Sequence, residues 1–163
     1  ALPHIYAVGD VIGSPGLASA SSEQGRLAAA HAFNVRDGSF PDSFPFGIYT
    51  IPEISSVGAQ ESDLEAKGIS YVVGRGRYNE LARGKIIGDE IGFLKLLFDA
   101  KTRKLLGVQV IGTGATELVH IGQAAFILGA GVDFFINNVF NYPTLAEAYK
   151  VAAYNAYNQL KAN

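Results

Sequence analysis

Residues 93–111 read FLKLLFDAKTRKLLGVQVI, and this stretch indicates the fold. It holds two apolar, β-prone runs, Phe93–Asp99 and Leu105–Ile111. Polar and apolar side chains alternate along them, with Lys95 opposed to its leucine neighbours, as in strands that bury one face. The polar segment 100–104 between the runs has the length of a hairpin loop. The stretch therefore predicts an antiparallel pair of strands.

Outward from this pair, the sequence predicts further strands and helices. Short β-prone runs at 48–51 and 71–73 indicate strands, and between them 61–67 indicates a helix that ends at Gly68. On the C-terminal side, apolar periodicity predicts a helix over 117–128 that is buried on two sides, and another over 145–160 with one apolar stripe. The fold class is therefore α+β, an antiparallel sheet backed by helices.

The beginning of the chain has a different texture. Residues 5–8 predict a buried strand, a Gly/Ser/Pro loop follows, and a helix is expected from about residue 17 to 33. Residues 34–46 carry Asp37-Gly38 and two prolines, which is typical of a linker. The chain contains no methionine and opens inside a strand-like run, which predicts that it is part of a longer protein.

Composition limits the classes of function. The 163 residues are 48% hydrophobic and carry a net charge of −2, which argues against disorder and against a nucleic-acid partner. The sequence shows no membrane-length apolar run and no signal peptide, so we expect no membrane partner. Because cysteine is absent and the three histidines are isolated, no disulfide or metal site is predicted.

Three local patterns have both a structural and a functional interpretation. Asp10 follows a predicted strand and precedes a helix start, where sugar and phosphate cofactors often sit, but these residues alone favour a plain Asx turn at the strand end. The run Gly112–Glu117 imitates a dinucleotide fingerprint, yet its third glycine is replaced by Glu117 and its strand belongs to a hairpin. Arg75, Arg77, Arg83 and Lys85 could bind a phosphate, although the acidic residues that follow favour a solvated mixed-charge loop.

The segment Tyr142-Pro143-Thr144-Leu145-Ala146-Glu147 is a fourth pattern with both a structural and a functional interpretation. Thr144 and Glu147 have the spacing of a capping box, in which the hydroxyl and the carboxylate each accept a backbone N–H of the other's residue. The proline before the cap restricts the chain, so Tyr142 is held at the mouth of a helix. Such a place can present a side chain to a ligand.

Taken together, four motifs resemble the pyridine nucleotide–disulfide oxidoreductase family. IYAVGD followed by PGLASASSEQGRLAAAHA is similar to its second flavin-contacting motif. PFGIYTIPEISSVG, GTGATELVHIGQAA and YPTLAEAYKVAA are similar to its C-terminal dimerisation domain, in the same order. The resemblance covers nearly the whole chain. It implies a remnant of the FAD-binding domain over 1–40 and a homodimerisation domain over 41–163.

The resemblance also implies roles for individual residues. Asp10 matches the aspartate that binds the ribityl chain of FAD, and Gly16, Leu17 and Ala18 match the helix start that approaches the flavin ring. Glu147 matches a glutamate that, in the disulfide reductases of the family, is paired with a histidine five residues before it, and the pair acts as the acid–base catalyst for a thiol across the dimer interface. The position of that histidine is Tyr142 here.

Tyr142 changes the expected reaction. A phenol, whose pKa is about 10, is a poor general base for a thiol at neutral pH. The resemblance therefore implies an FAD-dependent transhydrogenase that moves hydride between NADPH and NAD+, in the cytoplasm, with Tyr142 and Glu147 near the flavin of the partner subunit. The alternative is the dimerisation domain of a dihydrolipoamide dehydrogenase-like or mercuric reductase-like flavoprotein. In either case we expect the isolated chain to be inactive.

Overall fold

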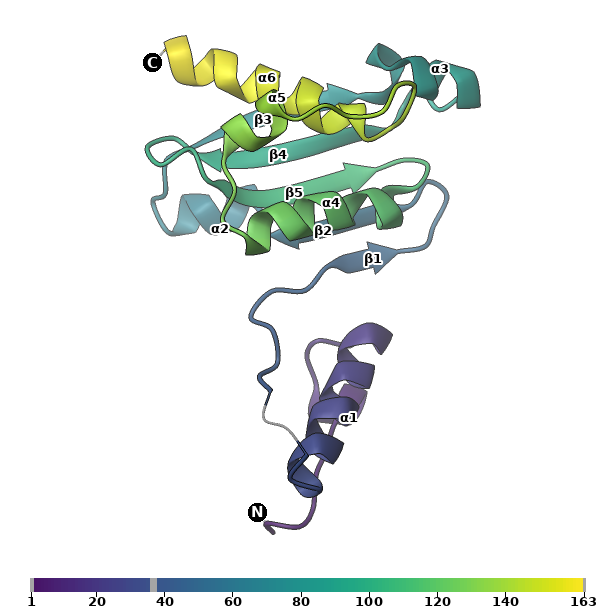
Figure 1. Cartoon of the computed structure of the whole chain (residues 1–163), viewed down its shortest axis with the longest axis vertical. Helices are drawn as coiled ribbons and strands as arrows, with labels where there is room; N and C mark the ends of the chain where they lie inside the picture. The colour runs from purple at the N-terminus through teal and green to yellow at the C-terminus, as the bar shows by residue number, and fades with distance from the viewer. Residues whose placement is uncertain (1, 36–37, 163) are drawn as a thin grey trace. The chain divides into compact units, whose positions relative to one another are not determined.

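The predicted hairpin is the centre of a five-stranded antiparallel sheet (Figure 1). The computed structural model describes residues 2–35 and 38–162. The strands are β1 (Phe46–Ile48), β2 (Ile54–Gly58), β3 (Tyr71–Arg77), β4 (Phe93–Asp99) and β5 (Leu105–Ile111). Their order is β1-β2-β5-β4-β3, and each neighbouring pair runs antiparallel. The predicted α+β class is confirmed.

The chain divides into two compact units, Ala1–Phe44 and Pro45–Asn163. The first contains the short 3-10 helix η1 (Gly9–Ile12) and α1 (Ala18–Ala32). The helices of the second are α2 (Glu61–Ala66), the 3-10 helix η2 (Tyr78–Glu80), α3 (Ala82–Ile87), α4 (Ala115–Ile127), α5 (Val132–Asn137) and α6 (Glu147–Ala162). None of the helices within the described ranges is long and apolar enough to cross a membrane.

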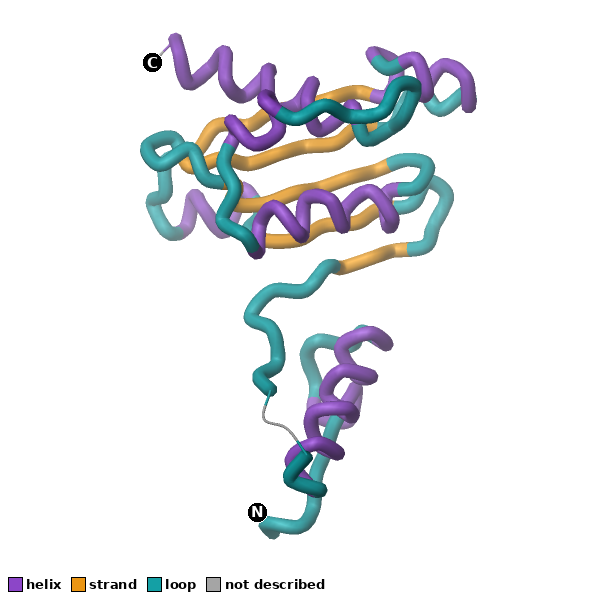
Figure 2. The backbone as a smooth tube through the Cα atoms, in the orientation of Figure 1, coloured by secondary structure: helices purple, strands orange, loops and turns teal. Residues whose placement is uncertain are grey.

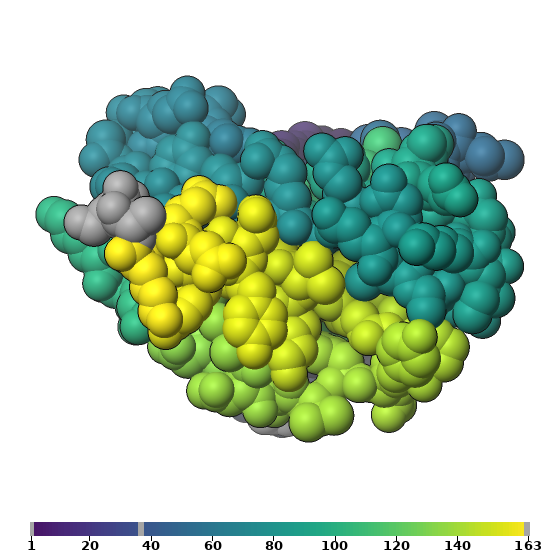
Figure 3. Space-filling view, turned by 90° about the horizontal axis from the view of Figure 1, so that it is seen from above, coloured from purple at the N-terminus to yellow at the C-terminus, as the bar shows by residue number. Residues whose placement is uncertain are grey.

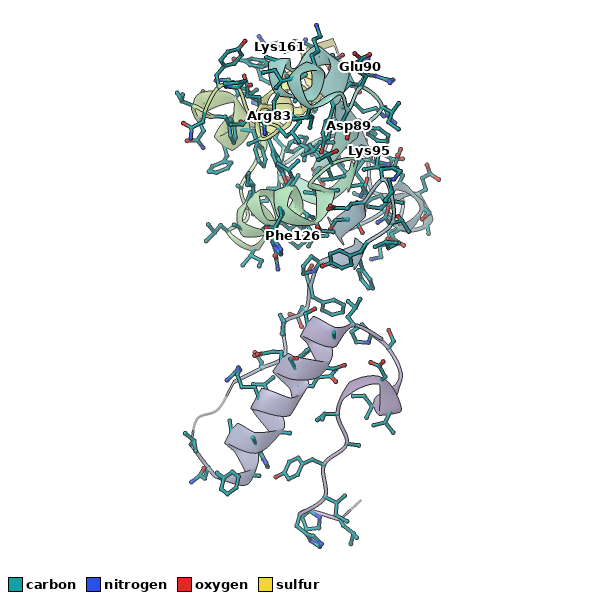
Figure 4. The ribbon with its side chains drawn as sticks, turned by 90° about the vertical axis from the view of Figure 1, so that its right-hand side faces the viewer. Arg83, Asp89, Glu90, Lys95, Phe126 and Lys161 are labelled. Carbon is teal, nitrogen blue, oxygen red and sulfur yellow. The ribbon has the colours of Figure 1, made fainter. Side chains whose placement is uncertain are left out.

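In the second unit, α4 and α6 cover one face of the sheet. Figure 1 shows them in front of the strands, with α4 over β5 and β2 and α6 over β3 and β4. The alternation predicted for β4 explains this arrangement, because Leu94 and Leu96 are fully buried under these helices. Lys95 points to the other face, where it forms an ion pair with Glu61 of α2 at 2.6 Å. Figure 4 places Lys95 and Phe126 of α4 on opposite sides of the sheet.

The packing of α6 on β3 is unusually close. β3 carries Gly74 and Gly76, and a Cβ at either would lie 2.0 or 2.4 Å from a backbone oxygen of α6. Two α6 side chains also bond to the backbone of this edge strand: Asn155 Oδ1 accepts the Arg75 N–H at 3.0 Å, and Gln159 Nε2 donates to the Val73 carbonyl at 2.7 Å. These contacts fix the position of α6 along the sheet. Figure 3 shows α6, in yellow, at the surface between the yellow-green segment before it and the teal segment around α3.

Several predictions about single elements are wrong. Residues 5–8 form no strand and are exposed, since a lone strand has no partner for its backbone groups. The strand expected at 48–51 lies at 46–48, because the chain bends at 50–52 before β2. Gly74–Arg77, expected in a solvated loop, belongs to β3.

The helix expected at 117–128 begins two residues earlier, and only one of its faces is buried. Ala115, Val119, Gly122 and Ala125 pack against the sheet. Leu118, Ile121 and Phe126, which are expected to be buried as well, are half-buried, and Leu128 is 82% exposed. The helices α3 and α5 were not predicted.

Candidate functional site

In the first unit, Asp10 lies in the 3-10 turn between the chain start and α1. Its Oδ1 accepts a hydrogen bond from Ser21 Oγ of α1 at 3.1 Å, and the side chain is otherwise exposed. The preceding Gly9 has φ of +76° and donates its N–H to Gln24 Oε1 at 2.7 Å. A side chain at Gly9 would be strained by this φ and crowded against Ser21. The turn is thus fastened to α1 at two points and presents one carboxylate.

The start of α1 is open toward solvent. Gly16 and Ala18 are exposed, and Leu17, the N-cap residue, is half-buried. Leu17 provides no side-chain cap, so the first amides of this 15-residue helix have no acceptor of that kind. Uncapped amides and the helix dipole favour an electronegative ligand atom. The exposed carboxylate of Asp10 can accept hydrogen bonds, and the uncapped start of α1 favours an electronegative atom.

In the second unit, Tyr142 and Glu147 lie at the start of α6. They belong to the loop between α5 and α6, drawn in teal in Figure 2, and to the first residue of the helix. The Tyr142 side chain is 74% exposed. The Glu147 carboxylate accepts the Thr144 N–H at 3.3 Å, which is half of the predicted capping box. The Thr144 hydroxyl does not complete the box, because it donates to the Asn141 carbonyl at 2.6 Å.

Glu147 also lines a shallow hollow of about 350 Å³. The other lining residues are Val139, Phe140, Lys150, Val151 and Tyr154. Lys150 Nζ donates to the Asn138 carbonyl at 2.9 Å, which ties the start of the loop to α6. The hollow therefore combines an apolar wall with one carboxylate and one ammonium group.

The chemistry that these groups allow is limited. Glu147 has no histidine partner at hydrogen-bond distance in the described residues, and the exposed phenol of Tyr142 precedes it in the loop. Within residues 2–35 and 38–162, no three His, Cys, Asp or Glu side chains are grouped to hold a metal ion. The site can orient a ligand and donate hydrogen bonds. Neither side chain is a histidine, the side chain that most often serves as a general base.

Two carboxylates with structural importance were not singled out from the sequence. Glu53 accepts both the N–H and the hydroxyl of Thr116, at 3.1 and 2.7 Å, so it caps α4 from the β1–β2 connection. These two bonds lower the pKa of Glu53. Asp89 accepts the N–H of Gly92 and of Thr113 at 2.9 and 2.7 Å. The contacts of these carboxylates with Thr116 and Thr113 have no local sequence signal, since the residues that they join are 63 and 24 positions apart.

The run Gly112–Glu117 connects β5 to α4. β5 pairs antiparallel with both of its neighbours, so this turn does not belong to a βαβ unit. Gly114, with φ of +70°, is the N-cap of α4. Its interpretation as a glycine-rich turn that leads into a helix is confirmed.

The sequence was compared with known proteins. Residues 44–153 match the family described as pyridine nucleotide-disulphide oxidoreductase, dimerisation domain. The chain is 55% identical over 159 residues to a soluble pyridine nucleotide transhydrogenase from Mycobacterium bovis (strain BCG / Pasteur 1173P2), covering 98% of this chain and 34% of that protein. A protein of the same name from Klebsiella pneumoniae is 51% identical over 164 residues, covering 98% and 35%. The chain thus spans about a third of the length of these curated relatives.

Solved structures show the same fold. The crystal structure of LpdA from Mycobacterium tuberculosis matches with a TM-score of 0.82 and 28% identity, covering 92% of this chain and 33% of that one. The HOCl-induced flavoprotein disulfide reductase RclA from Escherichia coli matches with a TM-score of 0.84 over 92% of this chain and 35% of its own. RclA is 22% identical, so this second match supports the fold alone.

Proposed function

The chain belongs to the pyridine nucleotide-disulphide oxidoreductase family, and on that premise we propose that it is the C-terminal part of an FAD-dependent NAD(P)+ transhydrogenase. In this proposal residues 1–40 complete an FAD-binding domain and residues 41–163 form the homodimer interface. The full protein would act in the cytoplasm and move hydride between NADPH and NAD+. The isolated chain would be inactive.

The observation that carries the proposal is the tyrosine at the mouth of α6. Tyr142 is 74% exposed, and Glu147 bonds to the Thr144 amide and not to a basic side chain. A thiol reductase needs a proton acceptor at this place, and a phenol is a poor one at neutral pH. The 55% identity to a protein named as a transhydrogenase also supports a transhydrogenase over a thiol reductase.

The residues of the first unit fit a flavin. When bound, FAD would supply a ring that takes hydride from one nicotinamide and gives it to another. Asp10 would accept hydrogen bonds from the ribityl hydroxyls, since its carboxylate is exposed and its turn is held against α1. The backbone of Gly16, Leu17 and Ala18 would approach the ring, because this helix start carries no side-chain cap.

Self-association would place the α6 site near the partner subunit. The half-buried and exposed apolar side chains of α4 support an interface, with Ile127 64% exposed and Leu128 just beyond the helix 82% exposed. Tyr142 and Glu147 would then line the flavin site of the partner, where they orient the substrate and exclude water.

The test is Tyr142→Phe in a full-length protein that carries this chain. We expect slower hydride transfer from NADPH to an NAD+ analogue, or an altered flavin spectrum, because the hydroxyl is lost at the site. Tyr49→Phe is the matched control, since Tyr49 is 82% exposed in the β1–β2 connection. If kinetics and spectrum are both unchanged in Tyr142→Phe, the tyrosine does not contribute to the site.

The alternative family members are tested by substrate. A dihydrolipoamide dehydrogenase-like or mercuric reductase-like protein needs a redox cysteine pair, and these 163 residues contain no cysteine. Efficient reduction of a disulfide or of Hg²⁺ by the full-length protein, with slow transfer between nicotinamides, would contradict the transhydrogenase proposal.

A further inference from the structure

The hydroxyl of Tyr149, in the first turn of α6, bonds to the backbone of α4. Gly122 donates its N–H to Tyr149 Oη at 2.9 Å, and Tyr149 Oη donates to the Leu118 carbonyl at 2.7 Å. Residues 118 and 122 are four apart, so an α-helix ordinarily pairs these two groups with each other. The tyrosine hydroxyl thus lies between the donor and the acceptor of one helical hydrogen bond.

The ring of Tyr149 is held as firmly as its hydroxyl. The side chain is 0% exposed. It stacks on Phe135 of α5 with ring centroids 5.4 Å apart, and on Phe140 of the α5–α6 loop at 6.4 Å. Burial raises the pKa of Tyr149, so the hydroxyl keeps its proton and continues to donate.

Gly122 makes this contact possible. A Cβ at this position would lie 2.8 Å from Tyr149 Oη and 2.7 Å from a methyl group of Val108 in β5. Any larger residue would therefore displace the hydroxyl or separate α4 from the sheet. The glycine has a negative helical φ, so the space and not the backbone conformation requires it.

Tyr149 touches every element that frames the candidate site of the second unit. Its own position is two residues beyond Glu147, and the ring that it stacks on, Phe140, is two residues before Tyr142. The local bond that holds Glu147 to the loop is long, at 3.3 Å to the Thr144 N–H. The side-chain hydrogen bonds of α6 to β3 lie further along the helix, at Asn155 and Gln159, although Ala148 in the first turn packs against Gly76 of β3.

We propose that Tyr149 is the positioning residue of the Tyr142–Glu147 site: it holds the first turn of α6 and the α5–α6 loop in register with α4. The inference rests on the proposed function for the importance of that site. The inference goes beyond the proposed function because it assigns the alignment of the site to the buried Tyr149 hydroxyl and to the stacking of the Tyr149 ring on Phe135 and Phe140. Because α4 also carries the exposed apolar residues, Tyr149 connects the expected interface with the site.

The experiment uses Tyr149→Phe in the full-length protein, which removes the hydroxyl and keeps the ring. Gly122→Ala disturbs the same hydrogen bonds from the α4 side, because the new Cβ would lie 2.8 Å from Tyr149 Oη. It is the second variant if Tyr149→Phe does not fold. Tyr157→Phe is the matched control, with the same change on the same helix, at a ring flanked by Arg103 and Lys161. Two readouts are measured: hydrogen exchange of backbone amides by mass spectrometry, and the kinetics of hydride transfer.

We expect faster exchange in residues 138–147 for both test variants, with the exchange of the β4–β5 hairpin unchanged in Tyr149→Phe. We also expect kcat for hydride transfer to fall roughly tenfold while KM for the nicotinamides changes less than about twofold, as for groups that are bound but misaligned. Tyr157→Phe should match the parent protein in both. Wild-type exchange in 138–147 for Tyr149→Phe or for Gly122→Ala overturns the proposal.

The two readouts separate this inference from the proposed function. If exchange in 138–147 increases and hydride transfer stays normal, Tyr149 does position the loop, and the role of Tyr142 and Glu147 in catalysis is wrong. If kcat falls with unchanged exchange in the loop, the hydroxyl acts in another way and the positioning role is refuted.

Discussion

The close packing of α6 on β3 predicts a large effect of one methyl group. In Gly74→Ala the new Cβ would lie 2.0 Å from the Ala152 carbonyl oxygen, which is 1.4 Å short of the 3.4 Å at which ordinary contact begins. The obstacle is backbone, so no side-chain rotation relieves it, and α6 must move away from the sheet by more than an ångström. That movement also stretches the bonds from the Arg75 N–H to Asn155 and from Gln159 to the Val73 carbonyl.

The magnitude follows from these terms. Overpacking typically costs about 1–3 kcal/mol, and each weakened hydrogen bond adds about 1 kcal/mol. We expect the free energy of unfolding to fall by about 3–5 kcal/mol, a large part of the roughly 5–15 kcal/mol of a typical domain. The corresponding decrease in Tm is about 10–20 °C for a unit of this size.

Urea and thermal unfolding of the chain, followed by circular dichroism, measure this effect. Arg75→Ala is the control, because it introduces the same residue into the adjacent position of the same strand, where the side chain is exposed and the N–H is kept. It should change stability by less than about 0.5 kcal/mol. A Gly74→Ala variant within about 1 kcal/mol of the parent chain would refute the close approach of α6 to β3.

Three further predictions concern ionisable side chains. Glu53→Gln should lower the free energy of unfolding by about 1 kcal/mol and flatten its fall toward acid pH, because the bonds from Thr116 lower the pKa of Glu53. The stabilisation by the Glu53 carboxylate is complete above the pKa of the unfolded chain and is lost as pH falls through the pKa of the folded chain. Urea unfolding across acidic pH tests this, and an unchanged profile contradicts it. Asp89→Asn should lower the free energy of unfolding by about 1–3 kcal/mol, because an amide has one acceptor oxygen and the carboxylate uses two. Thermal unfolding measures this, and a Tm equal to that of the parent chain would count against the prediction. Burial and the Glu65 carboxylate raise the pKa of Tyr71 to about 12. Glu65→Gln should lower it in an ultraviolet phenolate titration with Tyr71→Phe as the blank, and an unmoved titration would exclude the carboxylate as a cause.

Strong alternation made the central hairpin predictable. Phe93–Asp99 and Leu105–Ile111 are strands with the predicted bounds, since alternate side chains such as Leu94, Leu96 and Val108 are buried on the face that the helices cover. β2 was missed for the opposite reason. Its residues ISSVG carry two serines and little alternation, and it becomes a strand because it pairs with β5, where Ser56 faces Gln109. The polar Ser55 is buried there and donates to the Phe46 carbonyl.

The candidate site was predictable in part. The motif that contains Tyr142 and Glu147 is contiguous, so its place at the start of a helix follows from local capping rules. The predicted capping bond of the Thr144 hydroxyl is wrong, because the loop bends back and the hydroxyl donates to the Asn141 carbonyl instead.

The amino-acid sequence by itself determined the α+β class, the hairpin, the family and the position of the Tyr142–Glu147 motif before a helix, because periodicity, caps and contiguous motifs are local properties of the chain. Only the tertiary structure decided that α6 rests on two glycines of β3, that Glu53 caps α4, and that the Tyr149 hydroxyl enters the backbone of α4. These contacts join residues 27 or more positions apart. Such pairs form because packing brings together buried polar groups that must find partners, and that requirement has no periodicity in the sequence.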